Sequence, residues 1–477
     1  MKLLLKKIAL VALLLILAVP SGFCQIENLF ETRFEAYNFE FNGNGARAMG
    51  MGNAYLGVSD DITAIGWNPA GLYKMESPVL GFSYTTLNPR GEFNSDRVNF
   101  TTLTLEGERL SFGHSGAISS MTSANFLAPL RIKGHPFVGS IAYTRNSNEF
   151  QKQGYKVDLI ELFPIFNEVG VFLETDTVYE TVDILSQLDG GIDAINFGFA
   201  TRVHNDLSFG TSVNIYSGKV QRATDILVVG DSLPRNNRQY GELELVGQEN
   251  DSNSFSGLNV TVGLKLDGEV FDAGLVVRTP FSLNQKGETF SSEIVKVNGV
   301  PVLTDTTYQI DLLTKYDIPL MVGFGVGYQV NENWLLAADM EYRNFGNSHV
   351  KIRENLILVP GGSNIEEFTI LTAQEWQWSN VFIVRTGTEY LRKTGIGTIP
   401  LRVGLGYVPL PAPNVDVNGK RSTATSYQIS FGTGIHWNQI KLDIGYMFKS
   451  YDLASQSFLS EEQAQNHFLN ASFTGYF

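Results

Sequence analysis

The C-terminal residues of this chain alternate between two kinds of side chain. One series consists of Leu469, Ala471, Phe473, Gly475 and Phe477. The residues between them are Asn470, Ser472, Thr474 and Tyr476. A strand with this period presents one apolar and one polar face. Chain ends of soluble proteins usually fray, whereas a closed barrel in a bilayer needs its last strand to complete the wall. The pattern therefore favours a transmembrane β-barrel over a soluble β-sandwich.

The N-terminal residues have the order of a secretory signal peptide. Three lysines precede an apolar run at 8–19, which is too short to span a membrane. Small residues at Gly22 and Cys24 suit cleavage before Gln25, so we expect residues 1–24 to be removed. No other stretch of the sequence is apolar over the length that a membrane helix needs, which excludes a helical membrane protein.

Cys24 is the only cysteine of the chain. The alternative to cleavage after Cys24 is lipidation of this residue, but a lipoprotein signal favours a small residue where this chain has Phe23. If Cys24 is removed with the signal peptide, the mature chain has no cysteine for a disulfide or for thiol chemistry.

Composition and motifs argue against several functions. The net charge of −14 gives no electrostatic basis for binding nucleic acid. The six histidines show no metal-ligand spacing, and no nucleophile elbow or phosphate loop is present. We therefore predict no enzyme activity, no catalytic residues, no metal and no cofactor.

Alternating segments follow one another along the chain from residue 79 to its end. Short polar turns such as Asn205-Asp206 and Asp267-Gly268 connect many of them, as in β-hairpins. The pattern predicts an antiparallel, all-β, up-and-down barrel of about fourteen strands. Sixteen strands are possible if 98–105 and 109–115 belong to the wall. The longer connections are expected at 149–192, 219–255, 282–305, 346–379, 410–424 and 452–465.

The positions predicted to face the lumen include charges of both signs. They are Arg202, Asp339, Glu341, Arg343, Arg385, Glu389, Arg402, Lys441 and Asp443. Two interpretations remain open. The charges can pair with one another and stiffen the barrel, or they can orient the polar head of a ligand.

Residues 25–77 differ from the rest of the chain. They are rich in glycine and asparagine, lack a strand period and precede the first wall strand. A segment of this length can fold back and fill the lumen of a wide barrel. We therefore expect three parts: a signal peptide at 1–24, an N-terminal plug at 25–77 and a barrel at 78–477.

Three motifs in this N-terminal region carry a family resemblance. They are Gly45-Ala46-Arg47-Ala48-Met49-Gly50-Met51-Gly52-Asn53-Ala54, Asp60-Asp61 and Asn68-Pro69-Ala70-Gly71-Leu72. Together with later blocks at 317–342 and 385–409, they resemble the FadL/TodX-type outer-membrane transporters, with a distant similarity to PorV-like barrels. The resemblance implies a fourteen-stranded barrel with an N-terminal hatch. It also implies a hatch role for Asn68, Pro69 and Ala70.

The resemblance further implies a location in the bacterial outer membrane and passive uptake of hydrophobic compounds such as long-chain fatty acids or hydrocarbons. In such proteins the ligand leaves sideways through the wall. The expected partners are these small molecules, outer-membrane lipid and the barrel-insertion machinery, which would read the strand ending in Phe477. The alternative is a PorV-like barrel that binds protein partners during secretion.

The connection at 149–192 is unusually apolar for a segment in water. Its candidate ligand-binding residues are Leu159, Leu162, Phe163, Phe166 and Phe172. These residues can form a lid with a small core of its own or a surface site that captures an apolar ligand. The spacing from Thr177 to Glu180 predicts the start of a short helix. Arg47 is the candidate partner for a ligand carboxylate.

Overall fold

The computed structural model describes most of the chain after residue 42. The described residues are 43–95, 99–100, 103–104, 110–115, 117–132, 135–166, 172–232, 243–304, 307–359, 364–372, 378–411, 413–415, 421–423, 425–455 and 460–477. The expected signal peptide at 1–24 lies outside them. No helix in the described part of the chain is long and apolar enough to cross a membrane.

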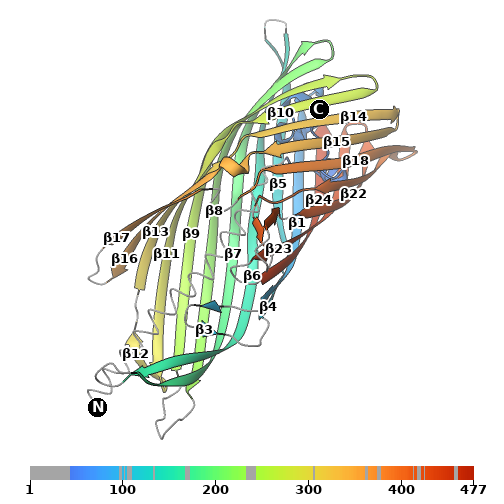
Figure 1. The fold of residues 1–477 in the computed structure, drawn as a ribbon. Coiled ribbons are helices and arrows are strands. Elements are labelled where there is room, and N and C mark those ends of the chain that lie inside the picture. Colours follow the sequence, from blue (N-terminus) through green and yellow to red (C-terminus); the bar gives the residue numbers. More distant parts are fainter. Residues whose placement is uncertain are drawn as a thin grey trace.

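The described residues form a closed antiparallel barrel of fourteen strands (Figure 1). The continuous wall strands are β1 (Val79–Ser95), β5 (Ile118–Ile132), β6 (His135–Phe166), β7 (Phe172–His204), β8 (Leu207–Ser232), β9 (Leu243–Asp267), β19 (Gly397–Tyr407), β22 (Ser426–Trp437), β23 (Ile440–Ser455) and β24 (Ser460–Tyr476). The barrel closes where β1 pairs with β24, from Val79 opposite Tyr476 onward. The predicted closing role of the last strand is therefore confirmed.

The other wall strands are each built from two pieces. These are β10 (Phe271–Arg278) with β11 (Phe281–Val297), β14 (Met321–Asn331) with β13 (Thr307–Ile318), β15 (Trp334–Arg343) with β16 (His349–Val359), and β18 (Val381–Thr394) with β17 (Asn364–Thr372). Pro280 and Pro319 stand at two of these breaks. Proline cannot donate a ladder hydrogen bond, so both strands are interrupted there.

The count of fourteen decides between the two predicted strand numbers. β2 (Asn99–Phe100) and β3 (Leu103–Thr104) pair with each other, separately from the wall. β4 (Leu110–Ser115) continues the line of β5 along β1, because β1 pairs with β5 up to Leu87 and with β4 from Arg90. Neither segment adds a strand to the wall. The remaining short strands are β12 (Val300–Thr304), β20 (Pro413–Val415) and β21 (Arg421–Thr423).

The wall is apolar outside and polar inside. Phe126 and Phe197 face outward and are each 48% exposed, whereas the inward Asn196 and Asn214 are buried. Trp334 lies near the short turns, and its indole N–H donates to Thr388 Oγ1 at 2.7 Å. Outward apolar residues with aromatic residues at the rim are typical of outer-membrane barrels. The protein is thus a bacterial outer-membrane barrel, with its short turns assigned to the periplasm.

Several expected connections are instead continuous strands. β6 and β7 pair from Phe137 opposite Thr201 to Phe166 opposite Phe172, so most of 149–192 is a long hairpin. β8, β9 and β11 likewise run through much of 219–255 and 282–305 (Figure 1). The helix predicted from Thr177 and Glu180 is wrong because both residues lie in β7. Pairing with both neighbouring strands outweighs the local capping signal there.

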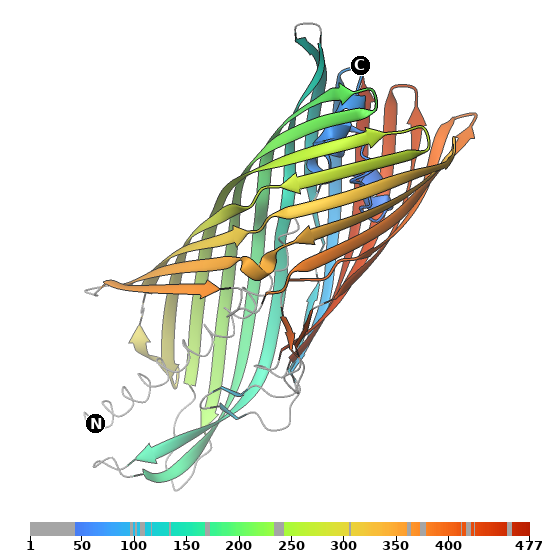
Figure 2. The same ribbon diagram turned by 45° about the horizontal axis from the view of Figure 1, so that its top comes forward.

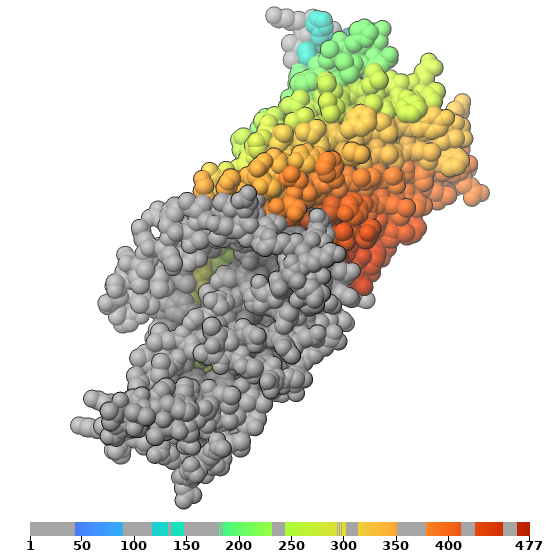
Figure 3. Space-filling model, viewed as in Figure 1, coloured from blue at the N-terminus to red at the C-terminus, as the bar shows by residue number. Residues whose placement is uncertain are grey.

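Residues 43–78, which we call the inner segment, lie inside the barrel near the short turns (Figure 2). The inner segment contains α2 (Ala46–Gly50), η1 (Ile62–Gly66) and η2 (Pro69–Lys74). Glycines allow its backbone to approach the wall closely. A Cβ atom on Gly404 would lie 2.0 Å from the backbone nitrogen of Gly52. On the face that Figure 3 shows, the green to orange-red wall strands form a continuous outer surface.

Candidate functional site

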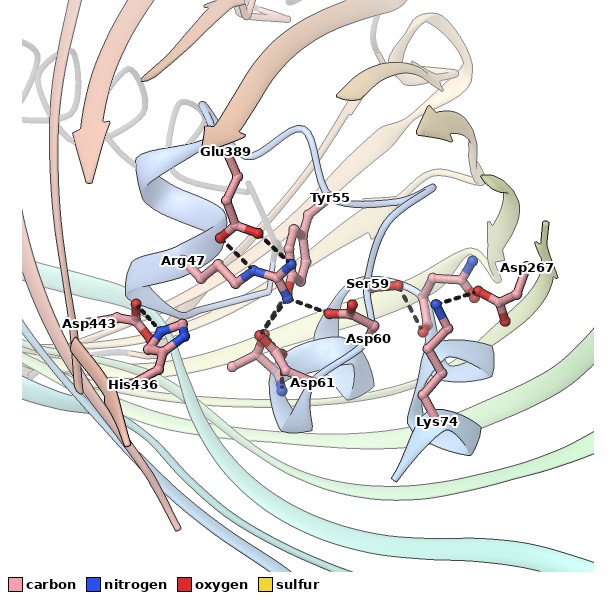
Figure 4. Close-up of polar contacts among 12 residues, drawn as sticks. Arg47, Tyr55, Ser59, Asp60, Asp61, Lys74, Asp267, Glu389, His436 and Asp443 are labelled. Carbon is pink, nitrogen blue, oxygen red and sulfur yellow. Dashed lines mark hydrogen bonds and ion pairs between the residues drawn. The ribbon is translucent and has the colours of Figure 1, made fainter. Parts of the chain in front are cut away.

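The inner segment is joined to the wall by a buried ionic network centred on Arg47 (Figure 4). The Arg47 guanidinium donates to Glu389 of β18 through Nε at 3.0 Å and through Nη2 at 2.9 Å. Its Nη1 donates to Asp60 and to the Tyr55 hydroxyl, the latter at 2.9 Å. Tyr55 donates in turn to Asp61 at 2.6 Å. A single arginine therefore connects three parts of the inner segment to one wall strand.

These contacts determine the charge states within the inner segment. Burial alone would lower the pKa of Arg47, but the carboxylates of Asp60 and Glu389 outweigh it and hold this pKa well above its ordinary value. Burial would raise the pKa of Asp60, but the adjacent Arg47 lowers it. Both groups stay ionised at neutral pH because each stabilises the charge of the other.

Glu389 also connects the inner segment to a second set of wall charges. Its Oε2 accepts from Arg402 Nε at 2.6 Å, and Arg402 Nη1 donates to Asp443 at 2.7 Å. Asp443 lies 3.0 Å from His436 Nε2. Three of the predicted lumen charges, Glu389, Arg402 and Asp443, therefore form one paired network, whereas Lys441 of β23 lies 5.1 Å from the centre of the Tyr476 ring. Arg202, also predicted to face the lumen, lies exposed with its guanidinium 4.9 Å from the centre of the Tyr73 ring.

A second wall carboxylate holds the backbone of the inner segment. Asp339 Oδ2 on β15 accepts from the N–H of Tyr55 at 2.5 Å and from the N–H of Leu56 at 2.8 Å. Asp339 is 4% exposed, so these hydrogen bonds form away from bulk water. Hydrogen bonds to a buried carboxylate are among the stronger ones in proteins. Asp339 and Glu389 thus fix two separate points of the inner segment.

Asn68, Pro69 and Ala70 form the start of η2. The Asn68 carboxamide oxygen accepts from the Ala70 N–H at 3.2 Å and caps this turn. Its Nδ2 donates to the carbonyl of Leu56 at 3.1 Å and to that of Leu264 on β9 at 3.0 Å. Pro69 at the first position of η2 suits a helical start. The motif therefore binds the wall, while its role as a moving hatch remains a prediction.

The wall accommodates this motif through glycines on three neighbouring strands. A Cβ atom on Gly210 would lie 2.3 Å from the Ala70 nitrogen, and one on Gly263 would lie 2.1 Å from Asn68 Oδ1. A Cβ atom on Gly274 would lie 2.8 Å from Asn68 Nδ2. Glycine at these three wall positions is the feature of the sequence that marks where the motif binds. The alternation of polar and apolar residues does not identify this place.

Asn68→Asp tests the seat of this motif. The change keeps the size of the side chain but removes both donated hydrogen bonds and buries a negative charge. We expect the inner segment to lose about 2–4 kcal/mol of its seating free energy. Hydrogen exchange of residues 43–78 in purified barrels measures this loss. Asn331→Asp at an exposed turn is the matched control and should leave the exchange unchanged. Equal protection in Asn68→Asp and the parent would contradict the expectation.

On the extracellular side of the inner segment, the lumen contains an apolar cluster. Its main members are Tyr216, Phe281, Leu283, Tyr316, Phe345 and Trp378. We call this set the lumen cluster. The rings of Tyr216 and Phe281 stack at 5.0 Å, and Phe345 meets Trp378 edge-on at 5.9 Å. Aromatic residues inside an otherwise polar lumen provide a favourable surface for apolar molecules.

Three arginines border the lumen cluster on its periplasmic side. Arg278 and Arg343 both lie opposite Met321, one on each neighbouring strand. Glu341 pairs with Arg343 and accepts from Arg385 Nη1 at 3.1 Å. Arg278 is only 7% exposed, and its Nε has no hydrogen-bond partner among the described residues. Arg278 therefore keeps one buried guanidinium N–H without an acceptor among the described residues, and a buried donor of this kind favours an anion.

The wall ladder is interrupted between β5 and β6. Regular pairing of these strands ends at Ser123 opposite Thr144. Beyond this point the described residues 117–122 and 145–152 make no backbone pairs with each other, and β6 meets β4 only where His114 lies opposite Gln153. The outward side chains nearby include Tyr84 and Met121, both exposed. The interruption therefore lies toward the extracellular end of the apolar outer surface.

The structure separates the predicted ligand-binding residues from one another. Arg47 lies at the periplasmic end, and its three nitrogens already bind carboxylates or Tyr55, so a ligand carboxylate would have to displace one of them. Leu159, Leu162, Phe163 and Phe166 lie in β6 and Phe172 lies in β7, near the tip of their hairpin. Arg145 is the first β6 residue beyond the last rung with β5, and Leu159 lies roughly 45 Å farther along the strand, at 3.3 Å per residue. Their role in ligand capture remains a prediction.

The described side chains also define what the lumen can hold. No group of three or more histidine, cysteine, aspartate or glutamate side chains among them is arranged to hold a metal ion. The residues overlooked by sequence reasoning are Asn44, Arg278 and the lumen cluster. The only sequence signal for Arg278 is the alternating pattern of its strand. Asn44, whose side chain donates to the carbonyls of Thr122 and Arg145, directly precedes the motif that begins at Gly45.

Comparison with known proteins gives the fold and one partial family match. The BamG family model matches residues 159–358. The Pseudomonas putida toluene transporter TodX has a TM-score of 0.54 and 14% identity, over 92% of this chain and 100% of that chain. A Pseudomonas aeruginosa FadL homologue scores 0.53 with 13% identity, over 91% and 98%. The CymD monoaromatic hydrocarbon channel scores 0.53 with 13% identity, over 92% and 99%. No curated protein matches the sequence.

Proposed function

We propose that this barrel, which has the fold of the FadL- and TodX-type transporters, admits hydrophobic compounds through the outer membrane by passive diffusion. The observation that carries the proposal is the lumen cluster, a set of buried aromatic and aliphatic residues inside a barrel whose other inward residues are mostly polar. Transfer of an apolar molecule from water to such an apolar environment is favourable without any chemical step. We therefore propose a channel and no enzyme activity.

The finer proposal concerns the cargo, and it names long-chain fatty acids. A fatty acid combines an apolar chain, worth about 0.8 kcal/mol per buried CH₂ group, with a carboxylate. The lumen cluster suits the chain, and Arg278 at its border has an Nε without a partner among the described residues. A carboxylate at Arg278 would supply the acceptor that this Nε lacks. Neutral hydrocarbons would use the same cluster and gain nothing from the arginine.

Arg278→Leu separates these two kinds of cargo. The change removes the charge while keeping an apolar side chain at the border of the lumen cluster. We expect uptake of a radiolabelled long-chain fatty acid to fall about ten-fold or more, because a hydrogen bond to a charged group contributes about 1.5–3 kcal/mol. Uptake of radiolabelled toluene should stay within about two-fold of the parent.

Arg202→Leu is the matched control, because Arg202 is exposed at the periplasmic rim and lies away from the lumen cluster. It should leave uptake of both compounds unchanged. Equal loss of fatty acid and toluene in Arg278→Leu would contradict a carboxylate site and indicate general damage to the channel. Unchanged uptake of the fatty acid would remove Arg278 from the proposal.

The five apolar residues of the β6–β7 hairpin complete the proposed route. Leu159, Leu162, Phe163, Phe166 and Phe172 would capture the ligand at the extracellular end, before it reaches the lumen cluster. Their place near the tip of a hairpin far from the inner segment supports this order of events. The sideways exit implied by the family resemblance would use the interruption between β5 and β6.

A second candidate function is a barrel that acts by binding protein partners. The observation that favours it is the BamG match over 159–358, which covers the end of β6 and all of β7, β8, β9 and β11. Affinity purification of the intact barrel from detergent-solubilised membranes tests this candidate. A stoichiometric protein partner, together with no uptake of either hydrophobic compound, would favour it over the channel.

A further inference from the structure

We propose that the Asn44 side chain closes the interruption between β5 and β6 and that its release opens the wall. This inference rests on the proposed function, because it assigns a residue to the sideways exit. It is argued from the end of the backbone ladder between β5 and β6 and from the hydrogen bonds of the Asn44 carboxamide. Neither feature depends on which compound the barrel carries.

Both strands at the interruption carry a bulge at the same height. In β5, Ser83 of β1 lies opposite Ser123 and Tyr84 lies opposite Met121, so Thr122 is passed over in the ladder with β1. In β6, the residue Asn146 is passed over in the same way in the pairing with β7. A bulge bends its strand and increases its local twist. Two bulges on adjacent strands thus account for the end of the ladder at this height.

Asn44 occupies the place of the first missing rung. If the β5–β6 register continued beyond Ser123 and Thr144, Thr122 and Arg145 would be the next pair. The Asn44 Nδ2 donates to the carbonyl of Thr122 at 2.8 Å and to the carbonyl of Arg145 at 3.2 Å. One side chain of the inner segment therefore bridges the two strands where their own backbone bonds stop.

The position of Asn44 depends on the rest of the inner segment. Its carbonyl accepts from the Trp67 indole at 3.3 Å, and a Cβ atom on the preceding Gly43 would lie 2.4 Å from this indole. Gly45, on the other side, has a φ of 127°, a conformation that side chains rarely adopt. Trp67 packs against Tyr55, with ring centres 6.2 Å apart. Asn44 therefore moves with Trp67 and is not a free surface residue.

Movement of the inner segment would consequently act on the wall. When Asn44 withdraws, the carbonyls of Thr122 and Arg145 lose this donor, and the backbone ladder of β5 and β6 has already ended at Ser123 opposite Thr144. The strands can then separate within the outer part of the apolar surface. The same motion that clears the lumen would thus open the exit.

The test measures how fast a lipid-soluble maleimide in the bilayer reaches a cysteine inside the wall. Ser123→Cys places the reporter at the last rung, where the parent side chain is 1% exposed, in a Cys24→Ser background. The barrels are full length and reconstituted in liposomes. Asn44→Ala and Asn44→Asp are compared with the parent. Thr86→Val is the control, because its hydroxyl bonds Ser119 between β1 and β5 and does not cross the interruption.

We expect Asn44→Ala to raise the labelling rate about ten-fold, since two net hydrogen bonds are lost. Asn44→Asp should raise it at least as much because a carboxylate cannot donate to the two carbonyls. Thr86→Val should label at the parent rate. Parent-like labelling in both Asn44 variants would overturn the inference, as would an equal increase in Thr86→Val. Uptake by the parent barrel is measured separately, so a failure of the channel proposal is recognised independently of the labelling result.

Discussion

Replacing Glu389 with alanine is expected to release the inner segment from its seat, at a cost of about 3–5 kcal/mol. The change leaves Arg47 and Arg402 buried without the carboxylate that both of them contact. Arg47 keeps Asp60 and Arg402 keeps Asp443, but the loss of a buried ion pair is far more costly than the loss of an exposed one. Hydrogen exchange of residues 43–78 should become fast, and cells carrying the variant should take up hydrophilic dyes that the parent barrel excludes.

Two further variants define the reason for the effect. Glu389→Gln keeps an acceptor oxygen but loses the charge, so it should fall between the parent and Glu389→Ala. Glu332→Ala removes a carboxylate at an exposed turn and should behave as the parent. Slow exchange of residues 43–78 in Glu389→Ala would show that the ionic network does not hold the inner segment. The same conclusion would follow if Glu332→Ala released the segment equally.

Joining β5 and β6 by a disulfide is expected to abolish uptake of hydrophobic compounds. Ser119 and Asn148 would face each other if the ladder continued in its observed register. Cysteines at these positions can bond only when the Cα atoms lie about 4.4–6.8 Å apart, so the bond holds the strands together. Uptake of radiolabelled fatty acid should fall to the level of cells without the barrel and return after reduction.

The control disulfide connects a pair that is already in the ladder. Phe82 of β1 lies opposite Ala124 of β5, so cysteines there should bond without moving the wall. This variant should keep its uptake under oxidising conditions. If the Ser119–Asn148 disulfide forms completely and uptake continues, the cargo does not leave between β5 and β6, and the exit must be sought elsewhere in the wall.

Alternation along the sequence was sufficient to predict the barrel but not the height of its wall. The period of two places Asp339, Glu341 and Arg385 inside, and the structure confirms all three as buried. The outer halves of β6 and β7 were missed because apolar residues follow one another there, as at Leu162 and Phe163, so the period of two is lost. The helix predicted at residues 177–180 failed for a related reason. A helix-capping pattern is local and carries no information about the neighbouring strands that pair with the segment.

The site was harder to predict because its contacts join distant parts of the chain. Arg47 was singled out as a ligand for a carboxylate, and its observed carboxylate partner Glu389 lies 342 residues away. A single sequence contains no signal for that pairing. Asn44 donates to two carbonyls that lie at bulges, and a bulge changes the alternating pattern of the sequence by only one residue. Asn68-Pro69-Ala70 was recognisable as a motif, but its seat on three glycines required the structure.

The most direct test of the central claim is uptake of a radiolabelled long-chain fatty acid and of toluene by cells with and without this barrel. The barrel must first be shown to be inserted and folded. Our account predicts faster uptake of both compounds when the barrel is present, with the fatty acid alone depending on Arg278. Equal uptake with and without a correctly inserted barrel would contradict the channel. The second proposed function, binding of protein partners, would then be the better explanation.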